Sequence, residues 1–200
     1  MSARSIVIKI GGSLYDLPDL GRRLSCFLAE LDSSRLLLVP GGGPTVEAIR
    51  QLDSCHRLGE DASHWLALQA LSVNARFLVQ LLLESRAELM SELVELPGAW
   101  ERRALPILDP FPFALANDAC SDRLPHSWET TSDSLAARVA TVAGVHRLVL
   151  LKSCDLPADM TWAEATRRGL VDKHFAAILA SISPRLQEIK VVNFRHWQPR

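Results

Sequence analysis

Runs of apolar residues and glycine turns alternate along the first part of the chain. The segment SIVIKI at residues 5–10 is rich in β-branched residues and ends at a glycine pair, which predicts a buried strand. Apolar residues at helical spacing over 17–32 predict a helix, and RLLLVP at 35–40 predicts a second strand that ends before three glycines. Proline then opens a predicted helix over 44–53. This order of elements favours a parallel α/β sheet with crossover helices.

The middle of the chain carries a wide apolar face. Residues 62–85 contain few helix breakers and predict one long, well-buried helix. The next segment, ELPGAWERRALPILDPFPFAL at 95–115, contains prolines throughout and predicts a strand or two with irregular connections. GVHRLVLLKS at 144–153, preceded by a helix, predicts a third strong strand. EIKVVNF at 188–194 predicts the last strand, after a loop and short helices. With no repeat and no linker, we expect one domain over residues 1–200.

Composition excludes several classes of function. Hydrophobic residues make up 48% of the chain and charged residues 22%, which is typical of a globular protein. The net charge of −1 offers no strong field to nucleic acid or to an anionic membrane. No apolar window reaches membrane-spanning length, and the four cysteines show no CxxC spacing that would indicate a zinc site or a disulfide framework. We therefore expect a cytoplasmic protein without a nucleic-acid partner, a membrane partner or a metal site of its own.

Three predicted strands end in turns that suit an anion. They read KIGGS, VPGGGPT and LVLLKSCD, and ligands of α/β sheets bind outside the carboxyl ends of the strands. Glycine lets backbone N–H groups approach an anion closely, and Lys9 and Lys152 add positive charge. Any one of these turns is most often only a tight turn, but together they predict a phosphate site. The chain lacks GxxxxGK[ST] and GxGxxG, which excludes a Walker P-loop and the dinucleotide fingerprint.

The stretch HSWETTSDSLAARVA at 126–140 joins a polar block abruptly to an alanine-rich apolar run. Thr130 or Thr131 is a good N-cap for a helix, with Asp133 in its first turn complementing the helix dipole. Asp133 can then pair with Lys9, which would explain a lysine inside an apolar strand. The alternatives are a helix that is merely well capped and a His-Ser-Trp run that is simply a packed loop.

Four of these segments, in this order, resemble the amino acid kinase family: VIKIGGSLY, LVPGGGPTVEAIR, TSDSLAARVA and LVLLKSCD. That family includes acetylglutamate, carbamate, uridylate and isopentenyl phosphate kinases. Within it, HSWETTSDS and GLVDKHF most resemble the branch that includes the archaeal methanofuran-pathway aminomethylfuran phosphate kinase. The resemblance implies an α/β fold, a three-layer αβα sandwich around a mainly parallel sheet. It also implies that the nucleotide lobe, at about 150–200, is shorter than in typical members.

The resemblance further implies roles for individual residues. Three would be catalytic, with Lys9 neutralising the transferring phosphoryl group, Asp133 orienting the lysines and Lys152 closing the nucleotide strand. The nucleotide-binding residues would be Gly11, Gly12, Ser13, Lys152, Ser153, Asp155 and Lys173. The acceptor-binding residues would be Gly41, Gly42, Gly43, His126, Ser127, Trp128, Thr131 and Ser132.

The implied reaction is ATP-dependent phosphoryl transfer to a phosphate or carboxylate acceptor, for example an aminomethylfuran phosphate in a methanofuran-like pathway. Mg²⁺ would arrive with the nucleotide, since no HxH or DxD pair offers a metal site. A homodimer formed through the helix at 62–85 is implied as well. The alternative is a degenerate member that binds nucleotide or another anion as a sensor, storage or partner subunit. Leucine and proline follow Asp155 where the closest motif continues with glycine, and this departure keeps that alternative open.

Overall fold

The computed structural model describes residues 4–157, 159–181 and 186–199. Its centre is a six-stranded sheet of order β3-β4-β2-β1-β5-β6, in which every pair is parallel. The strands are β1 (Ser5–Ile10), β2 (Arg35–Val39), β3 (Ala87–Met90), β4 (Leu105–Leu108), β5 (Arg147–Lys152) and β6 (Glu188–Asn193). The four strands predicted at 5–10, 35–40, 144–153 and 188–194 are confirmed, as is the parallel α/β sheet.

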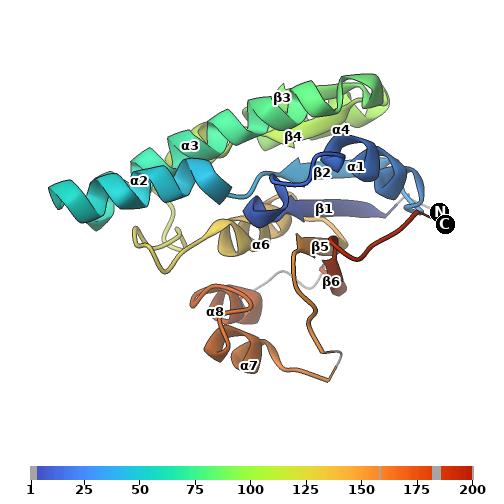
Figure 1. Cartoon of the computed structure of the whole chain (residues 1–200). Coiled ribbons are helices and arrows are strands. Elements are labelled where there is room, and N and C mark those ends of the chain that lie inside the picture. Colours follow the sequence, from blue (N-terminus) through green and yellow to red (C-terminus); the bar gives the residue numbers. More distant parts are fainter. Residues whose placement is uncertain (1–3, 158, 182–185, 200) are drawn as a thin grey trace.

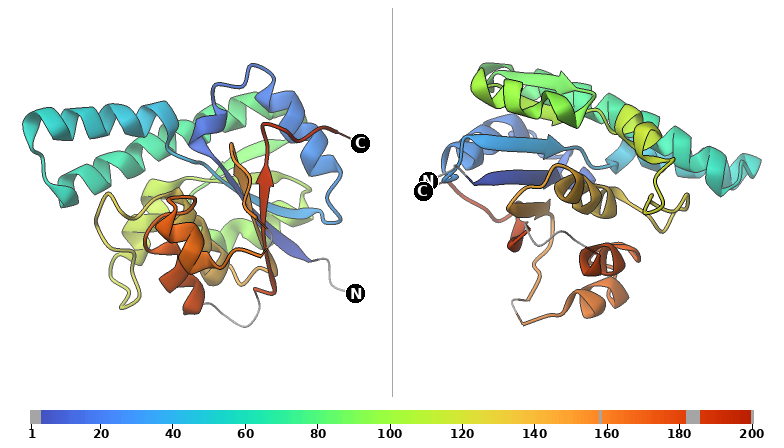
Figure 2. Two further views of the ribbon diagram at one scale, coloured as in Figure 1. Left: turned by 60° about the horizontal axis from the view of Figure 1, so that its bottom comes forward. Right: turned by 180° about the vertical axis from the view of Figure 1, so that it is seen from behind.

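Helices connect the strands and cover the sheet (Figure 1). They are α1 (Leu20–Ala29), α2 (Gly43–His56), α3 (Glu60–Leu81), α4 (Leu96–Glu101), α5 (Pro110–Asn117), α6 (Ser132–Val142), α7 (Trp162–Arg167) and α8 (Phe175–Ala180). The helices predicted at 17–32, 44–53 and 62–85 are confirmed as α1, α2 and α3. The expectation that the third of these is well buried was wrong in part, because Val73, Phe77 and Leu81 of α3 are exposed. Helices α2 and α3 form a long hairpin that extends beyond the sheet, while α7 and α8 form a small lobe on the side of β5 and β6 (Figure 2).

The alternation of side chains along the strands divides the core into two layers. In β1, Ile6, Ile8 and Ile10 are fully buried in the cluster that also holds the apolar face of α1. Val7 lies in the opposite cluster, which holds α6 and α8. Because successive side chains of a strand point to opposite faces, Lys9 shares the face of Val7. The three-layer arrangement is therefore confirmed, and a lysine lies under α6.

Helix α6 lies close to the sheet because its buried side chains are small. Ala136, Ala137 and Ala140 are at most 1% exposed. The helix follows Thr131, which has extended backbone dihedrals and accepts a hydrogen bond at Oγ1 from the amide of Asp133 at 3.4 Å. Of the two candidate N-caps, Thr131 is therefore the one used.

The prediction for 95–115 was partly wrong, because this segment holds two helices and only one strand, β4. Pro97 and Pro110 lie in the first turns of α4 and α5, where a proline needs no hydrogen-bond acceptor for its nitrogen. A capping box between Glu92 and Glu95 precedes α4, and this spacing is a helix-start signal present in the sequence. Strand β3, just before it, was not predicted.

The two glycine turns pack directly against each other, since β1 and β2 are neighbours in the sheet. A Cβ atom added to Gly12 would lie 2.1 Å from the amide nitrogen of Gly43, and one added to Gly41 would lie 2.4 Å from the amide nitrogen of Gly12. Gly43 also has a φ of 57°, a region that favours glycine. Only glycine fits this backbone-to-backbone contact.

We predict that Gly41→Ala lowers the free energy of unfolding by about 1–3 kcal/mol, because the new methyl group overlaps backbone that cannot rotate away. Urea denaturation checks this. Gly98→Ala in α4 is the control, since its Cβ would meet only the flexible end of Arg102 at 3.3 Å. Equal stability of Gly41→Ala and the natural chain would contradict the packing of the turns.

Candidate active site

Two lysines and one aspartate form a buried charged cluster at the carboxyl ends of β1 and β5. Asp133 Oδ1 lies 2.8 Å from Lys9 Nζ, and Asp133 Oδ2 lies 2.5 Å from Lys152 Nζ. The side chains of Lys9, Asp133 and Lys152 are only 6%, 5% and 14% exposed. Lys152 also donates a hydrogen bond to the carbonyl oxygen of Leu170 at 2.6 Å. The cluster therefore holds one excess positive charge in a largely dry place.

The charges of the cluster shift the pKa values of Asp133 and Lys152. Burial alone would raise the pKa of Asp133, but the ammonium groups of Lys9 and Lys152 outweigh it and hold that pKa below its ordinary value. Burial lowers the pKa of Lys152, an effect that Asp133 opposes and Lys9 reinforces. Asp133 is therefore ionised at neutral pH and serves as the shared counter-ion of both lysines.

Side chains from α3 and from the turn after β1 hold the second glycine turn in place. The amide of Asn74 donates to the carbonyl oxygens of Gly41 at 2.8 Å and Gly42 at 2.6 Å, and its own oxygen accepts from Thr45 Oγ1 at 2.9 Å. The Tyr15 hydroxyl donates to the Gly41 carbonyl at 3.1 Å and accepts from the Gly41 amide at 3.0 Å. Burial raises the pKa of Tyr15, so it stays a neutral donor. Sequence reasoning missed all three side chains, which are ordinary polar residues without a motif.

Of the predicted nucleotide-binding residues, Ser153 lies against the first glycine turn, Asp155 lies beside the end of β6, and Lys173 lies apart from both. Ser13 and Ser153 are joined by a hydrogen bond of 2.9 Å between their hydroxyls. Asp155 accepts from Asn193 at 3.0 Å, and Arg195, which the sequence did not single out, donates to the Ser13 carbonyl at 2.6 Å. The C-terminal segment after β6 therefore lies against the turn.

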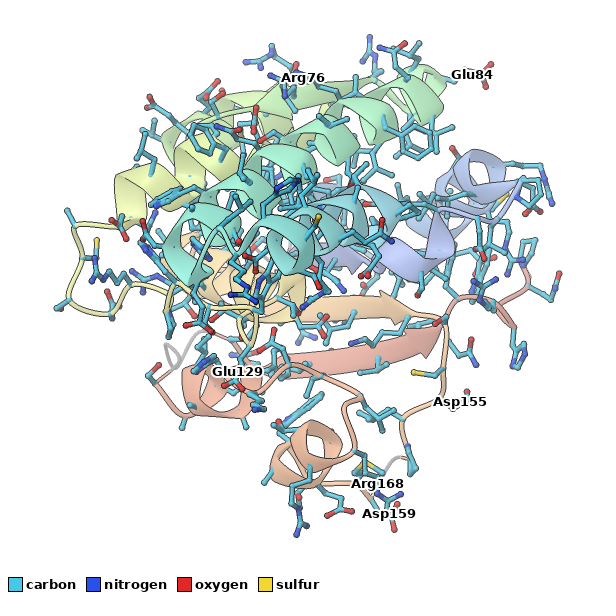
Figure 3. All side chains as sticks on the ribbon, turned by 60° about the vertical axis from the view of Figure 1, so that its left-hand side comes forward. Arg76, Glu84, Glu129, Asp155, Asp159 and Arg168 are labelled. Carbon is cyan, nitrogen blue, oxygen red and sulfur yellow. The ribbon has the colours of Figure 1, made fainter. Side chains whose placement is uncertain are left out.

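Lys173 has a side chain that is 66% exposed and pairs with Glu129. Glu129 lies where the loop before α6 meets the lobe that carries Asp159 and Arg168, whereas Arg76 on α3 and Glu84, just beyond the end of α3, lie far from this lobe (Figure 3). This pair ties the loop to the lobe at the surface. It does not bring Lys173 into the buried cluster.

A pocket opens beside Gly42, between α2, α3, α5, α6 and the loop at 118–131. Its apolar wall comes from Val46, Trp65, Leu68, Leu71, Phe113 and Leu135. The predicted acceptor residues Ser127, Trp128, Thr131 and Ser132 also line it, and Arg50 stacks over the Trp128 ring with its guanidinium carbon 4.2 Å from the ring centroid. The pocket therefore offers flat apolar surfaces at the end of the glycine turn.

The polar atoms of this loop bind other parts of the protein. The indole of Trp128 donates to Asp53 Oδ2 at 2.7 Å, and this hydrogen bond lowers the pKa of Asp53. The ring nitrogens of His126 lie 2.6 Å from Asp61 Oδ1 and 2.7 Å from Asp118 Oδ1. The Thr131 hydroxyl donates to Asp172 at 2.8 Å. The rings face the pocket while their polar atoms hold the loop.

His126 also stacks on His64, with ring centroids 4.4 Å apart. Burial and the neighbouring His126 lower the pKa of His64 to about 4. His64 is therefore neutral at physiological pH and acts as an aromatic surface at the pocket mouth.

The sequence matches the amino acid kinase family over residues 4–155. The chain belongs to this family. It is 26% identical over 150 residues to the [5-(aminomethyl)furan-3-yl]methyl phosphate kinase of Methanocaldococcus jannaschii, covering 74% of the chain but only 66% of that relative's length. Of solved structures, the UMP kinase of Ureaplasma parvum superposes with a TM-score of 0.68 at 15% identity, covering 98% of the chain and 92% of its own. The uridylate kinase of Archaeoglobus fulgidus superposes with a TM-score of 0.62 at 16% sequence identity, and the match covers 88% of this chain and 86% of that enzyme.

The family and fold expected from the four motifs are thus confirmed for this amino acid kinase family member. Among the described residues, no helix is long and apolar enough to cross a membrane. In the same part of the chain, no group of three His, Cys, Asp or Glu side chains is placed to hold a metal ion.

We predict that Asp133→Asn lowers the free energy of unfolding at pH 7 by about 3–5 kcal/mol, because it leaves two buried ammonium groups without a counter-ion. Urea denaturation of this variant, with the exposed Asp159→Asn as control, checks the magnitude.

The stability that the Asp133 carboxylate contributes depends on pH with a definite sign. The folded-state pKa of Asp133 is depressed, so its stabilising effect is full above the ordinary value of 3.8 and disappears as the pH falls through the folded value. If the difference in the free energy of unfolding between the natural chain and Asp133→Asn became larger at acid pH, this account would be contradicted.

Proposed function

We propose that this chain is an ATP-dependent small-molecule kinase that transfers the γ-phosphoryl group to a phosphate-bearing acceptor. The observation that carries the proposal is the cluster of Lys9, Asp133 and Lys152 beside two interlocked glycine turns. Transfer of a phosphoryl group needs little covalent chemistry from the protein, but it needs fixed positive charge where negative charge spreads over the phosphoryl oxygens. One excess buried positive charge supplies that need.

The residues present fit a nucleotide polyphosphate. Helix α2 begins at Gly43 in the second glycine turn, and the opening N–H groups of a helix have no acceptor within the helix. The amides at the start of α6, by contrast, already donate to Thr131 and Asp172. Mg-ATP would supply the phosphoryl group, and its Mg²⁺ would arrive with the nucleotide. Gly11, Gly12 and Ser13 would bind the phosphates, Ser153 and Asp155 would line the nucleotide side, and Lys9 and Lys152 would stabilise the transferred group. We also propose that the reaction takes place in the cytoplasm, where ATP is available, and that the chain is a single domain with a short nucleotide lobe.

The pocket beside Gly42 would bind the acceptor. Its walls are aromatic and aliphatic, with Trp65, Phe113 and Trp128 able to pack on a flat ring. The relative in M. jannaschii is named for a furan phosphate that bears an aminomethyl group. We therefore propose an aromatic phosphomonoester of this kind, in a methanofuran-like pathway, as the acceptor. Gly41, Gly42 and Gly43 would hold the phosphate end of the acceptor, and the loop at 126–132 would hold the ring.

The alternative, a degenerate family member that binds nucleotide without turnover, is less favoured. A binding protein needs positive charge but does not need that charge held on a shared carboxylate. Here each oxygen of Asp133 contacts one lysine, and both lysines remain. The shape of the cluster thus suits transfer rather than storage.

The test is to incubate the protein with Mg-ATP and [5-(aminomethyl)furan-3-yl]methyl phosphate, or UMP for comparison, and to measure ADP and the diphosphate product. We predict turnover with the furan phosphate and a kcat lower by a factor of about 100 or more for Lys9→Met, since a fixed charge at the transferred group is lost. Asp133 keeps Lys152 as a partner, so the variant should fold. Lys190→Met, an exposed lysine of β6, is the control. Unchanged turnover in Lys9→Met would refute the assignment of the site.

We further propose that the protein is a homodimer formed through α3. Val73, Phe77 and Leu81 lie one helical turn apart and are 58%, 40% and 37% exposed, which makes an apolar stripe along the helix. Such a stripe is self-complementary when two copies meet about a two-fold axis. The ring of Phe77 also packs edge to face on the ring of Tyr15, with the ring centroids 5.7 Å apart. The stripe therefore adjoins a side chain that holds the second glycine turn.

We predict a sedimentation mass of twice the 22.1 kDa of the chain. Val73→Glu should shift it to the single-chain mass, because a charge would be buried in the interface. Val142→Glu, at an exposed position on α6, is the matched control and should stay dimeric. A monomeric natural chain, or a Val73→Glu variant that still dimerises, would rule out this interface.

A further inference from the structure

Residues 170–172, in the lobe after β5, contact Lys152 of the charged cluster and the first turn of the helix that carries Asp133. The carbonyl oxygen of Leu170 accepts from Lys152 Nζ at 2.6 Å. Two residues later, the carboxylate of Asp172 lies at the first turn of α6, the helix that carries Asp133. Neither residue was singled out from the sequence, where the segment GLVDKHF pointed only to Lys173.

The Asp172 carboxylate accepts from three donors at each oxygen. Oδ2 accepts from the Thr131 amide at 3.0 Å, the Thr131 hydroxyl at 2.8 Å and the Ser134 amide at 2.9 Å. Oδ1 accepts from the Ser134 hydroxyl at 2.5 Å and from the amides of His174 at 3.1 Å and Phe175 at 3.0 Å. One carboxylate thus joins the starts of α6 and α8.

Only part of this set is an ordinary helix cap. The bonds from His174 and Phe175 are local, and any Asx cap before α8 would provide them. The bonds from Thr131 and Ser134 come from residues that are 41 and 38 positions away in sequence. The same Thr131 hydroxyl accepts a hydrogen bond from the amide of Asp133, so a short chain of hydrogen bonds runs from Asp172 to the backbone of Asp133.

We propose that Asp172 is a positioning residue for phosphoryl transfer. It fixes the first turn of α6, so that the Asp133 carboxylate can bridge both lysines. It also holds the Leu170 carbonyl against Lys152, because the two residues belong to the same short turn. This role rests on the proposed function, since the group that Asp172 positions is the one assigned to the transferred phosphoryl group.

The test compares Asp172→Asn with Thr161→Ala. Thr161 caps α7 in the same lobe by accepting from the Glu164 amide at 3.2 Å, so its loss weakens the lobe without touching the cluster. We expect Asp172→Asn to lower kcat by a factor of about 10–100 with little change in the KM of the acceptor, because misplacement of a charged group by a fraction of an ångström is that costly. Thr161→Ala should keep kcat.

A pH profile separates positioning from mere loss of folded protein. Lys152 faces Asp133, Lys9 and Cys154, and its charged form is stabilised by the Leu170 carbonyl. If Asp172 holds that carbonyl in place, the alkaline limb of kcat shifts to lower pH in Asp172→Asn, since Lys152 then loses its proton more easily. An unchanged limb and an unchanged kcat, with a thermal midpoint lowered as in Thr161→Ala, would overturn the proposal.

Two further measurements keep the outcome clear. If Asp172→Asn does not fold, Ser134→Ala is the second variant, because it removes one of the long-range hydrogen bonds to Asp172. It should lower kcat a few-fold and shift the alkaline limb in the same direction, and no change in either would overturn the proposal.

If the natural chain turns over no acceptor, the proposed function fails, and the affinity for Mg-ADP replaces kcat as the measured quantity. Weaker Mg-ADP binding in Asp172→Asn than in Thr161→Ala would then support the positioning role, and equal binding would overturn it.

Discussion

The structure depends on keeping two ammonium groups and one carboxylate out of water in the same place. An isolated buried charge is very costly, and even a buried pair is stable only if its geometry is good and its remaining hydrogen-bonding groups have partners. Asp133 can serve two lysines because each of its oxygens contacts one of them. The arrangement leaves one positive charge uncompensated by protein. An anionic ligand would be the natural group to balance it, and that is the physical reason for regarding the cluster as a phosphoryl-transfer site.

Several elements of the fold serve this cluster. The strand period of two puts Lys9 and Lys152 on the same face of the sheet, where Val7, Leu148 and Leu150 are also buried. The alanines of α6 bring its backbone near β1, so that a side chain as short as aspartate reaches both lysines. The turn at 170–172 then supplies a carbonyl to one lysine and a carboxylate to the start of α6. Core packing and site geometry are thus set by the same contacts.

The sequence could reveal those parts of the site that are marked by unusual chemistry. A lysine inside an apolar strand, glycine runs after two strands and an aspartate in the first turn of an alanine-rich helix are each rare, and their pairing follows from charge. By contrast, Asn74 and Asp172 are common polar residues. The partners of Asn74 lie 29–33 positions away and the α6 partners of Asp172 lie 38 and 41 positions away, and no local pattern predicts such contacts. Strand β3 and helices α4 and α5 were not predicted from the sequence, for a different reason. Strand β3 has only four residues, and α4 and α5 are short helices with proline in their first turns, a pattern that is also typical of irregular connections.

The loop at 118–131 shows how the acceptor side differs from the nucleotide side. Its polar groups looked like ligand-binding groups in the sequence, yet Trp128 is held by Asp53, His126 by Asp61 and Asp118, and Arg138 of α6 pairs with Asp122 of the loop. Carboxylates of α2, α3 and the loop itself therefore fix the loop in position, and the surfaces left for an acceptor are mainly rings and aliphatic chains. The pocket begins beside Gly42 of the second glycine turn, and aromatic and aliphatic side chains form much of its wall. These walls suit the flat ring of the proposed acceptor, because aromatic side chains pack well on such a ring.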